Sequence, residues 1–181
     1  ANRGQCHLRS RVQSLGRSQP MTTTVINPNI KLRPALPEDE DFLVAVYGST
    51  RQQELAMVPW TDEQKEAFIR FQLKAQLAHY QAEYPNAEYS IILFEALPVG
   101  RLYLDRREAE IRIMDLTLLP ESRGKGISSP IIQHLMEEAL ESAKKLSINI
   151  DKLSQSQAIF EQFGFKPTED TGFHVLYVWQ S

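Results

Sequence analysis

The stretch from Asp115 to Ser128 carries residue types that could bind a phosphate. It runs Asp-Leu-Thr-Leu-Leu-Pro-Glu-Ser-Arg-Gly-Lys-Gly-Ile-Ser, which predicts a strand, a glycine turn and the first turn of a helix. The first backbone amides of a helix have no partners within it, and the helix dipole adds partial positive charge there, so they can hold an anionic phosphate. Arg123 and Lys125 could add charge-assisted hydrogen bonds to a pyrophosphate.

A glycine turn before a helix is weak evidence when it stands alone. The alternative interpretation is a plain helix start with two exposed cations. Neither the full phosphate-binding loop of nucleotide hydrolases nor the three-glycine dinucleotide fingerprint occurs in the chain. The surrounding elements therefore have to decide between the two interpretations.

The spacing of apolar residues predicts those elements. The expected order is strand, two helices, three strands, helix, strand, helix and strand, over residues 29–33, 36–50, 61–80, 89–94, 99–105, 110–118, 131–143, 146–150, 154–163 and 173–179. Capping boxes are predicted at Thr61–Gln64 and Ser154–Gln157, and Gly164 is placed to end the last helix. Residues 89–118 predict an antiparallel meander, and residues 110–150 a strand, helix, strand crossover.

Composition narrows the class of partner. The chain has 181 residues and a net charge of −3, which suits one globular domain over residues 21–181. Residues 1–20 contain four arginines and no acid, so removing them leaves −7 for the remainder. An acidic body favours a cationic amine over nucleic acid, and no apolar run approaches the roughly 20 residues that span a bilayer.

The first twenty residues are interpreted as a tail. They could be a transit peptide, or could come from a start codon read too early or a remnant added during cloning, and Met21 resembles a true start. The single cysteine, Cys6, lies in this tail, so the body offers no disulfide or thiol nucleophile. With no ligand-spaced histidines either, we expect no metal site, and a cytoplasmic location is compatible with this composition.

The segment 118–127 resembles the acetyl-CoA motif of the GNAT acetyltransferases, whose form is Arg/Gln-x-x-Gly-x-Gly/Ala. The order of elements is also similar, and the resemblance covers residues 29–180. Further likeness lies in Leu-Ala-x-x-Pro-Trp at 55–60, Gly-Arg-Leu-Tyr at 100–103 and the aromatic last strand, features of bacterial members. The resemblance implies a GNAT acyl-CoA N-acyltransferase fold of the mixed α/β (α+β) class, with about six to seven strands flanked by about four helices.

The same resemblance implies acetyl-CoA as cosubstrate and direct transfer of the acetyl group to an amine acceptor. The thioester would lie where strands 110–118 and 146–150 separate. Dimers are frequent in this family, so a homodimer is one expectation. The implied cofactor-binding residues are those that align the pantetheine arm through their backbone, namely Leu116, Thr117 and Leu118, and those that hold the pyrophosphate, namely Arg123, Gly124, Lys125, Gly126, Ile127, Ser128 and Ser129.

Asp115 is the leading candidate for the base. An alkyl ammonium, with a pKa of about 10.4, is not nucleophilic until it loses a proton. Strand alternation would place Asp115 on one face with Ile111, Ile113 and Thr117, where apolar neighbours favour proton uptake. The alternative is a carboxylate paired with Arg112 or another cation, and a bulge in the strand would change its direction.

The C-terminal part departs from the family pattern. Many members carry Asn-x-x-Ala-x-x-Leu-Tyr before Gly-Phe, and that tyrosine protonates the leaving thiolate. Here Phe160 stands at the tyrosine position and Ser156 at the alanine position, and both are expected beside the cofactor. Water, Ser154, Ser156 or Tyr177 could replace the acid, while simple core packing is the alternative interpretation of Phe160.

The acceptor pocket is predicted by position only. Its expected residues are Arg51, Glu54, Trp60 and Tyr103, and aromatic faces suit cationic amines. The first functional hypothesis is an enzyme that acetylates a small amine, an amino acid or a peptide. The second is an acyl-CoA-binding module that has lost turnover, and the third is generic phosphate or nucleotide binding. Thiol release in the presence of an amine separates the first two.

Overall fold

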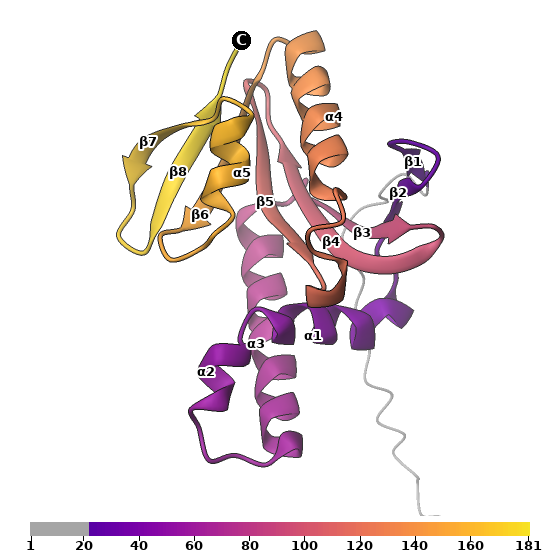
Figure 1. Ribbon diagram of the computed structural model, residues 1–181, viewed down its shortest axis with the longest axis vertical. Helices are drawn as coiled ribbons and strands as arrows, with labels where there is room; N and C mark the ends of the chain where they lie inside the picture. Colours follow the sequence, from indigo (N-terminus) through magenta and orange to yellow (C-terminus); the bar gives the residue numbers. More distant parts are fainter. Residues whose placement is uncertain (1–21) are drawn as a thin grey trace, which may run out of the picture.

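The computed structural model of the protein describes residues 22–181, which build one mixed sheet with helices on both faces (Figure 1). The predicted tail and Met21 lie outside the described residues. The strand order is β1-β2-β3-β4-β5-β6-β8-β7. The strands are Thr24–Val25 (β1), Ile30–Pro34 (β2), Glu88–Phe94 (β3), Leu97–Arg106 (β4), Glu110–Leu118 (β5), Lys145–Asp151 (β6), Lys166–Asp170 (β7) and His174–Trp179 (β8). The α-helices are Glu40–Ser49 (α1), Gln52–Ala56 (α2), Asp62–Glu83 (α3), Ser128–Glu141 (α4) and Gln157–Gln162 (α5).

The pairing of the central strands agrees with the sequence. Strands β3, β4 and β5 form the predicted antiparallel meander, and β5, α4 and β6 form the predicted crossover, with β5 and β6 parallel. The described residues hold eight strands and five α-helices, slightly more than the six to seven and four expected. Strand β7 escaped prediction because all of its residues are exposed and carry no alternating apolar pattern, and β1 and α2 are very short.

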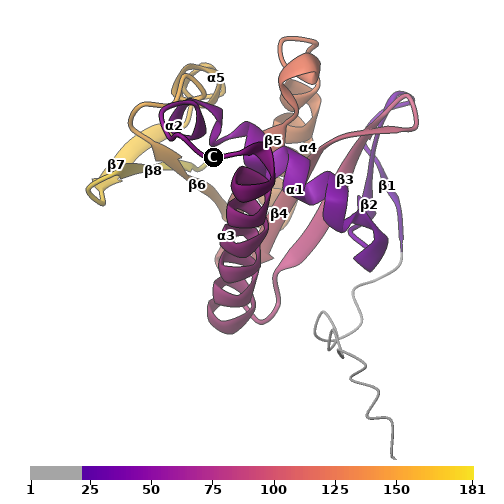
Figure 2. The same ribbon diagram turned by 90° about the horizontal axis from the view of Figure 1, so that it is seen from below.

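Hydrophobic clusters on both faces hold the helices to the sheet. Ile131 and Leu135 of α4 and Phe160 of α5 pack against Ile111 and Ile113 of β5 on one face. The opposite face carries α1 and α3, whose Leu43, Tyr47 and Leu73 enclose Ile91 of β3. Figure 2 shows these helices on the two sides of the sheet. We call the two sides the α4 face and the α3 face.

The predicted helix start was right at α3 and wrong at α1 and α5. At the start of α3 the capping box is present, because Gln64 N donates to Thr61 Oγ1 and Thr61 N donates to Gln64 Oε1. At residues 154–157 it is absent, since α5 begins only at Gln157 and no side chain caps it. The helix expected from residue 36 begins at Glu40, after a 3₁₀ turn over Pro37–Asp39. None of the helices formed by residues 22–181 is long and apolar enough to cross a bilayer.

Candidate active site

The turn between β5 and α4 presents free backbone amides at the start of a helix. Gly124 and Gly126 have φ of 72° and 73°, a left-handed conformation that costs other residues roughly 1–2 kcal/mol. A Cβ atom on either would meet no atom within 4 Å, so conformation and not crowding requires glycine. The amides of residues 124–127 donate to no backbone acceptor in the described part of the chain, and Ile127 gives α4 no side-chain cap. The turn therefore has the geometry of an anion-binding site.

The side chains of this turn point in different directions. Ile127 is 1% exposed in the core of the α4 face, so only its backbone can contact a ligand. Arg123 turns back toward the sheet, where Nε donates to the Leu118 carbonyl oxygen at 3.0 Å and Nη2 to Ser49 Oγ at 3.5 Å. Lys125 is exposed, and Ser128 and Ser129 are half-buried at the first turn of α4. Contact of these side chains with a pyrophosphate stays a prediction.

Strands β5 and β6 separate just before this turn. Their last paired residues are Ile113 and Ile148, although β5 continues to Leu118, where it still pairs with β4. Beyond Ile148, β6 pairs only with β8. The stretch 116–118 of β5 therefore has one edge without a neighbouring strand, which is the separation that the sequence predicted. We call this place the fork.

A bulge in β5 sets the direction of Asp115. Tyr103 of β4 pairs with Asp115, but the next residue, Leu104, pairs with Ile113, so Met114 is the extra residue. The expectation that Asp115 shares a face with Ile111 and Ile113 was therefore wrong. Both isoleucines belong to the core of the α4 face, whereas Asp115 lies on the α3 face, because one extra residue reverses the alternation.

Asp115 is paired with a cation that the sequence did not single out. Its Oδ2 accepts from Nη2 of Arg101 at 2.6 Å and its Oδ1 from Oγ1 of Thr117 at 2.6 Å. The side chains of Arg101 and Asp115 are 1% and 12% exposed. Arg112, the partner considered from the sequence, pairs instead with Glu110 and Ser147. The alternative of an ion-paired carboxylate is thus the one found, and its part in catalysis stays a proposal.

A stack of cations and aromatic rings leads from Asp115 to the surface. Arg101 lies over the Tyr47 ring at 5.5 Å and over the Tyr103 ring at 4.9 Å, and Arg51 lies over the Tyr47 ring at 5.5 Å. Arg51 also donates to Glu54 Oε1 at 3.0 Å. The predicted pocket residues Arg51 and Glu54 are therefore joined through Tyr47 to the carboxylate at the fork.

The other two predicted pocket residues, Tyr103 and Trp60, differ in their exposure. Tyr103 is fully buried, packing edge-on against Tyr89 at 4.8 Å and Tyr80 at 6.4 Å. Burial raises the pKa of Tyr103 to about 12, although the nearby Arg101 guanidinium opposes this. Trp60 is 39% exposed and packs on Phe68 of α3.

Three predicted site residues, Tyr177, Phe160 and Ser156, come from α5 and the strand and loop next to it. Tyr177 of β8 pairs with Ile148, and its single hydroxyl proton is shared between two acceptors, Glu161 Oε1 at 3.1 Å and Gln157 Oε1 at 3.2 Å. Burial, with Glu161 nearby, raises the pKa of Tyr177, so the phenol keeps its proton. Phe160 is 3% exposed and packs edge-on against Phe165 at 5.2 Å, which is the core packing considered as the alternative. Ser156 is exposed before α5, and its hydroxyl lies 2.7 Å from that of Ser154.

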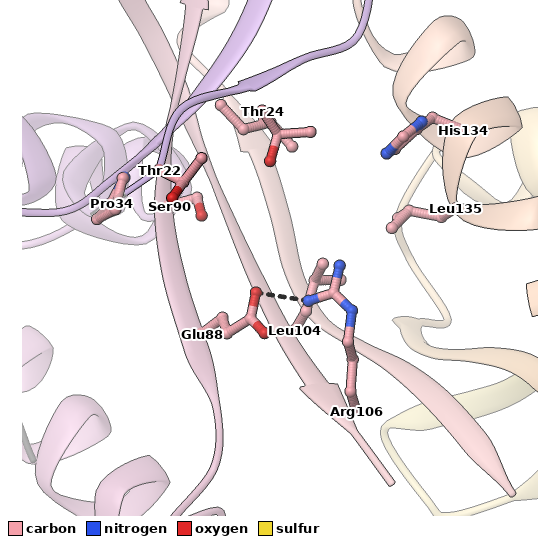
Figure 3. Close-up of a pocket in the computed structure, with 10 residues that line it drawn as sticks. Thr22, Thr24, Pro34, Glu88, Ser90, Leu104, Arg106, His134 and Leu135 are labelled. Carbon is pink, nitrogen blue, oxygen red and sulfur yellow. Dashed lines mark hydrogen bonds and ion pairs between the residues drawn. The ribbon is translucent and has the colours of Figure 1, made fainter. Parts of the chain in front are cut away.

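A cavity of about 110 Å³ lies apart from these residues, between the first strands and α4 (Figure 3). Its floor carries an ion pair of Arg106 Nη1 with Glu88 Oε2 at 2.5 Å, and Arg106 also holds Glu138 of α4. His134 lines the cavity from α4, but no group of three or more potential metal ligands occurs within residues 22–181. The ion pairs of Arg106 with Glu88 and Glu138 therefore hold α4 against the sheet.

Sequence reasoning overlooked Arg101 and Tyr47 as site residues. Arg101 was noted only within the resemblance at 100–103, with no role. The available signal was an arginine inside the apolar run Val99–Leu104, in a strand central to the meander. A buried arginine requires a carboxylate nearby, but the partner could not be identified without the bulge at Met114.

The comparisons with known proteins agree with this geometry. A sequence model of the acetyltransferase (GNAT) domain matches residues 57–175. The PaiA N-acetyltransferase of Thermoplasma acidophilum, solved in complex with coenzyme A, is 15% identical over 84% of this chain and 99% of its own, with a TM-score of 0.61. An acetyltransferase of Salmonella typhimurium that modifies the N-terminal serine of a ribosomal protein is 17% identical over 88% and 99%, with a TM-score of 0.61. No curated protein sequence matches. At these identities the structural likeness shows the fold.

Proposed function

The chain belongs to the GNAT acetyltransferase family, and we propose that it transfers an acetyl group from acetyl-CoA to a primary amine of a small molecule or peptide. Membership follows from the match over residues 57–175, and it makes acetyl-CoA the cosubstrate. The amine acceptor is the proposed part. An acidic body, with a net charge of −7 over residues 21–181, favours the approach of cationic amines.

The position of the fork supports this proposal most strongly. The unpaired edge of β5 runs directly into the turn whose amides are free, so one extended ligand could contact both. An edge strand offers unpaired backbone groups to an extended partner, and the pantetheine arm carries amides that suit such pairing. Because the Leu118 carbonyl oxygen already accepts from Arg123, Leu116 and Thr117 are the main backbone partners in this proposal.

The two faces of the sheet divide the chemistry. The pyrophosphate would lie at the start of α4, whereas Asp115 lies on the α3 face, from which the acceptor would approach. The acceptor first loses its ammonium proton to water, because an ammonium nitrogen has no lone pair to react. The free amine nitrogen then bonds to the thioester carbon, the carbon–sulfur bond breaks and the thiolate leaves. The nitrogen that has formed its new bond is cationic and strongly acidic, so it can pass its proton to the Asp115 carboxylate, which Arg101 holds in place.

The thiolate needs no strong acid. A thiol has a pKa of about 8.5 and is a fair leaving group near neutral pH, whereas a positioned acid typically adds 10² to 10⁴-fold. Tyr177 stays protonated and is the proposed donor, but its hydroxyl is held by Glu161 and Gln157. We therefore expect modest turnover unless the acceptor or water reaches the sulfur.

A second candidate function rests on Phe160. This residue has no proton to give and packs in the core, which favours an acyl-CoA-binding module with little turnover. Both candidates predict that acetyl-CoA binds at the fork. They differ only in the release of free thiol when an amine is present.

The deciding experiment is a free-thiol assay of the full chain with acetyl-CoA and a panel of primary amines. The panel holds a peptide with an N-terminal serine, free amino acids, an aminoglycoside and n-butylamine. Thiol release that depends on an amine, together with N-acetylated product by mass spectrometry, supports the transferase. Binding of acetyl-CoA without release on any amine contradicts it and favours the binding module.

A further inference from the structure

Arg101 is a fully buried cation on the α3 face. Nη2 donates to Asp115 Oδ2 at 2.6 Å and to Gln76 Oε1 at 3.3 Å, and the guanidinium lies between the rings of Tyr47 and Tyr103. Its Nε and Nη1 have no hydrogen-bond partner among the described residues. A buried charge is strongly unfavourable unless it is paired. The carboxylate of Asp115 is therefore what keeps this arginine in place, and the reverse also holds.

The same contact fixes the direction of the carboxylate. Asp115 accepts from Arg101 at Oδ2 and from Thr117 at Oδ1, so neither oxygen can rotate without losing a donor. Each carboxylate oxygen has a second lone pair that can accept a further hydrogen bond. The side chain keeps 12% exposure. The carboxylate can therefore bind one more donor in a fixed orientation.

The bulge puts this fixed carboxylate beside the fork. Asp115 lies two residues beyond Ile113, the last β5 residue paired with β6, and one residue before the edge proposed for the pantetheine arm. A carboxylate at this place can accept an N–H of an amine and direct the nitrogen lone pair toward the thioester. Rotation of the carboxylate would misdirect the nitrogen, and small misplacements of a reacting group can cost about 10²-fold in rate.

We propose that Arg101 is a positioning residue of the transferase, which fixes the Asp115 carboxylate in the orientation that receives the acceptor nitrogen. The inference rests on the proposed function. Asp115 takes one proton from the nitrogen after the carbon–nitrogen bond has formed and passes it to solvent. In this proposal Arg101 touches neither the acceptor nor the thioester, because its side chain is only 1% exposed.

The test is a double-mutant cycle on kcat with acetyl-CoA and n-butylamine, a minimal primary amine. Arg101→Gln is expected to lower kcat by about 10- to 100-fold, with the KM for acetyl-CoA changed less than about 2-fold, since the glycine turn lies on the α4 face. In the Asp115→Asn background, Arg101→Gln should lower kcat no further, because residues that act as a unit are not additive. Arg101→Lys should retain part of the kcat that Arg101→Gln loses, because lysine supplies the charge without the planar guanidinium group.

Two further variants keep the test decisive. Thr117→Val removes only the Oδ1 donor and no charge, so it decides the question if Arg101→Gln fails to fold, and it should lower kcat several-fold only when Asp115 is present. Arg33→Gln is the matched control, because it breaks an arginine–carboxylate pair on β2, which β3 and β4 separate from β5 and the fork, and it should leave kcat unchanged.

The contrary results are distinct. Equal losses from Arg101→Gln with and without Asp115, or an unchanged kcat, overturn the positioning role while leaving the proposed function intact. Absence of amine-dependent thiol release by the unaltered protein contradicts the proposed function itself, and the positioning role falls with it.

Discussion

The buried pair of Arg101 and Asp115 gives a sharp prediction about stability. Asp115→Asn leaves the guanidinium, 1% exposed, without its counter-ion. At a separation of 2.6 Å, the gross attraction between unit charges is roughly 6 kcal/mol for an effective dielectric constant of about 20. Breaking a buried pair typically costs 3–5 kcal/mol. We expect about 3 kcal/mol, the lower end, because the asparagine oxygen can still accept from Nη2.

Urea unfolding of the full chain, followed by circular dichroism, measures this difference. The matched control is Asp41→Asn, which breaks a 2.7 Å pair with Arg70 whose carboxylate side chain is 86% exposed. Such surface pairs contribute little to stability, because water and salt screen them. A loss for Asp115→Asn no larger than that for Asp41→Asn would refute the reasoning, since it would mean that Arg101 reaches water or another partner.

Three further predictions follow from the site. Gly126→Val should weaken acetyl-CoA binding by about 10-fold or more, because it strains the turn. The control is Gly172→Val, at a similar φ of 93° in the turn before β8, which should destabilise the fold without affecting binding. Equal affinities of the two variants for acetyl-CoA in calorimetry would contradict this. Burial raises the pKa of Tyr80 and of Tyr103 to about 12, against about 10 in the unfolded chain. Because the unfolded state loses these protons first, the free energy of unfolding should fall as pH rises from 10 toward 12. A free energy of unfolding that stays constant over this range in urea titrations would count against this. Phe160→Tyr should destabilise the protein by about 1–3 kcal/mol, because the hydroxyl enters a core without a partner, and should not raise the rate of thiol release; a faster enzyme would show that position 160 reaches the sulfur.

Local chemistry explains which parts of the fold could be predicted. The start of α3 was predictable because Thr61 and Gln64 satisfy free amides within four residues. The glycine turn was predictable because Gly124 and Gly126 are compatible with a left-handed backbone that other residues avoid. Strand β7 was not, because Lys166–Asp170 is an exposed edge that gains its structure from pairing with β8.

The direction of Asp115, the proposed base, depends on a feature that local sequence patterns do not encode. The extra residue Met114 is defined only by the register between β4 and β5, and it decides whether Asp115 faces α3 or α4. The sequence offered the base and the ion-paired carboxylate as separate alternatives. In the proposed function the two are compatible, because the acidic nitrogen gives its proton to a carboxylate that Arg101 holds.

In the proposed function, the fold separates the two substrates. The α4 face supplies free amides and the helix start for an anion, and the α3 face supplies a carboxylate for a cation or an amine. The fork is the place where the sheet between them opens. Each face can therefore vary without disturbing the other, so changes in acceptor recognition need not alter the cofactor site.

The most direct test of the central claim is calorimetric titration of the full chain with acetyl-CoA. The account predicts saturable binding at one site per chain, with Gly126→Val strongly weakened. Absence of binding, or equal binding by the Gly126→Val variant, would contradict the assignment of the turn and the fork as the acetyl-CoA site.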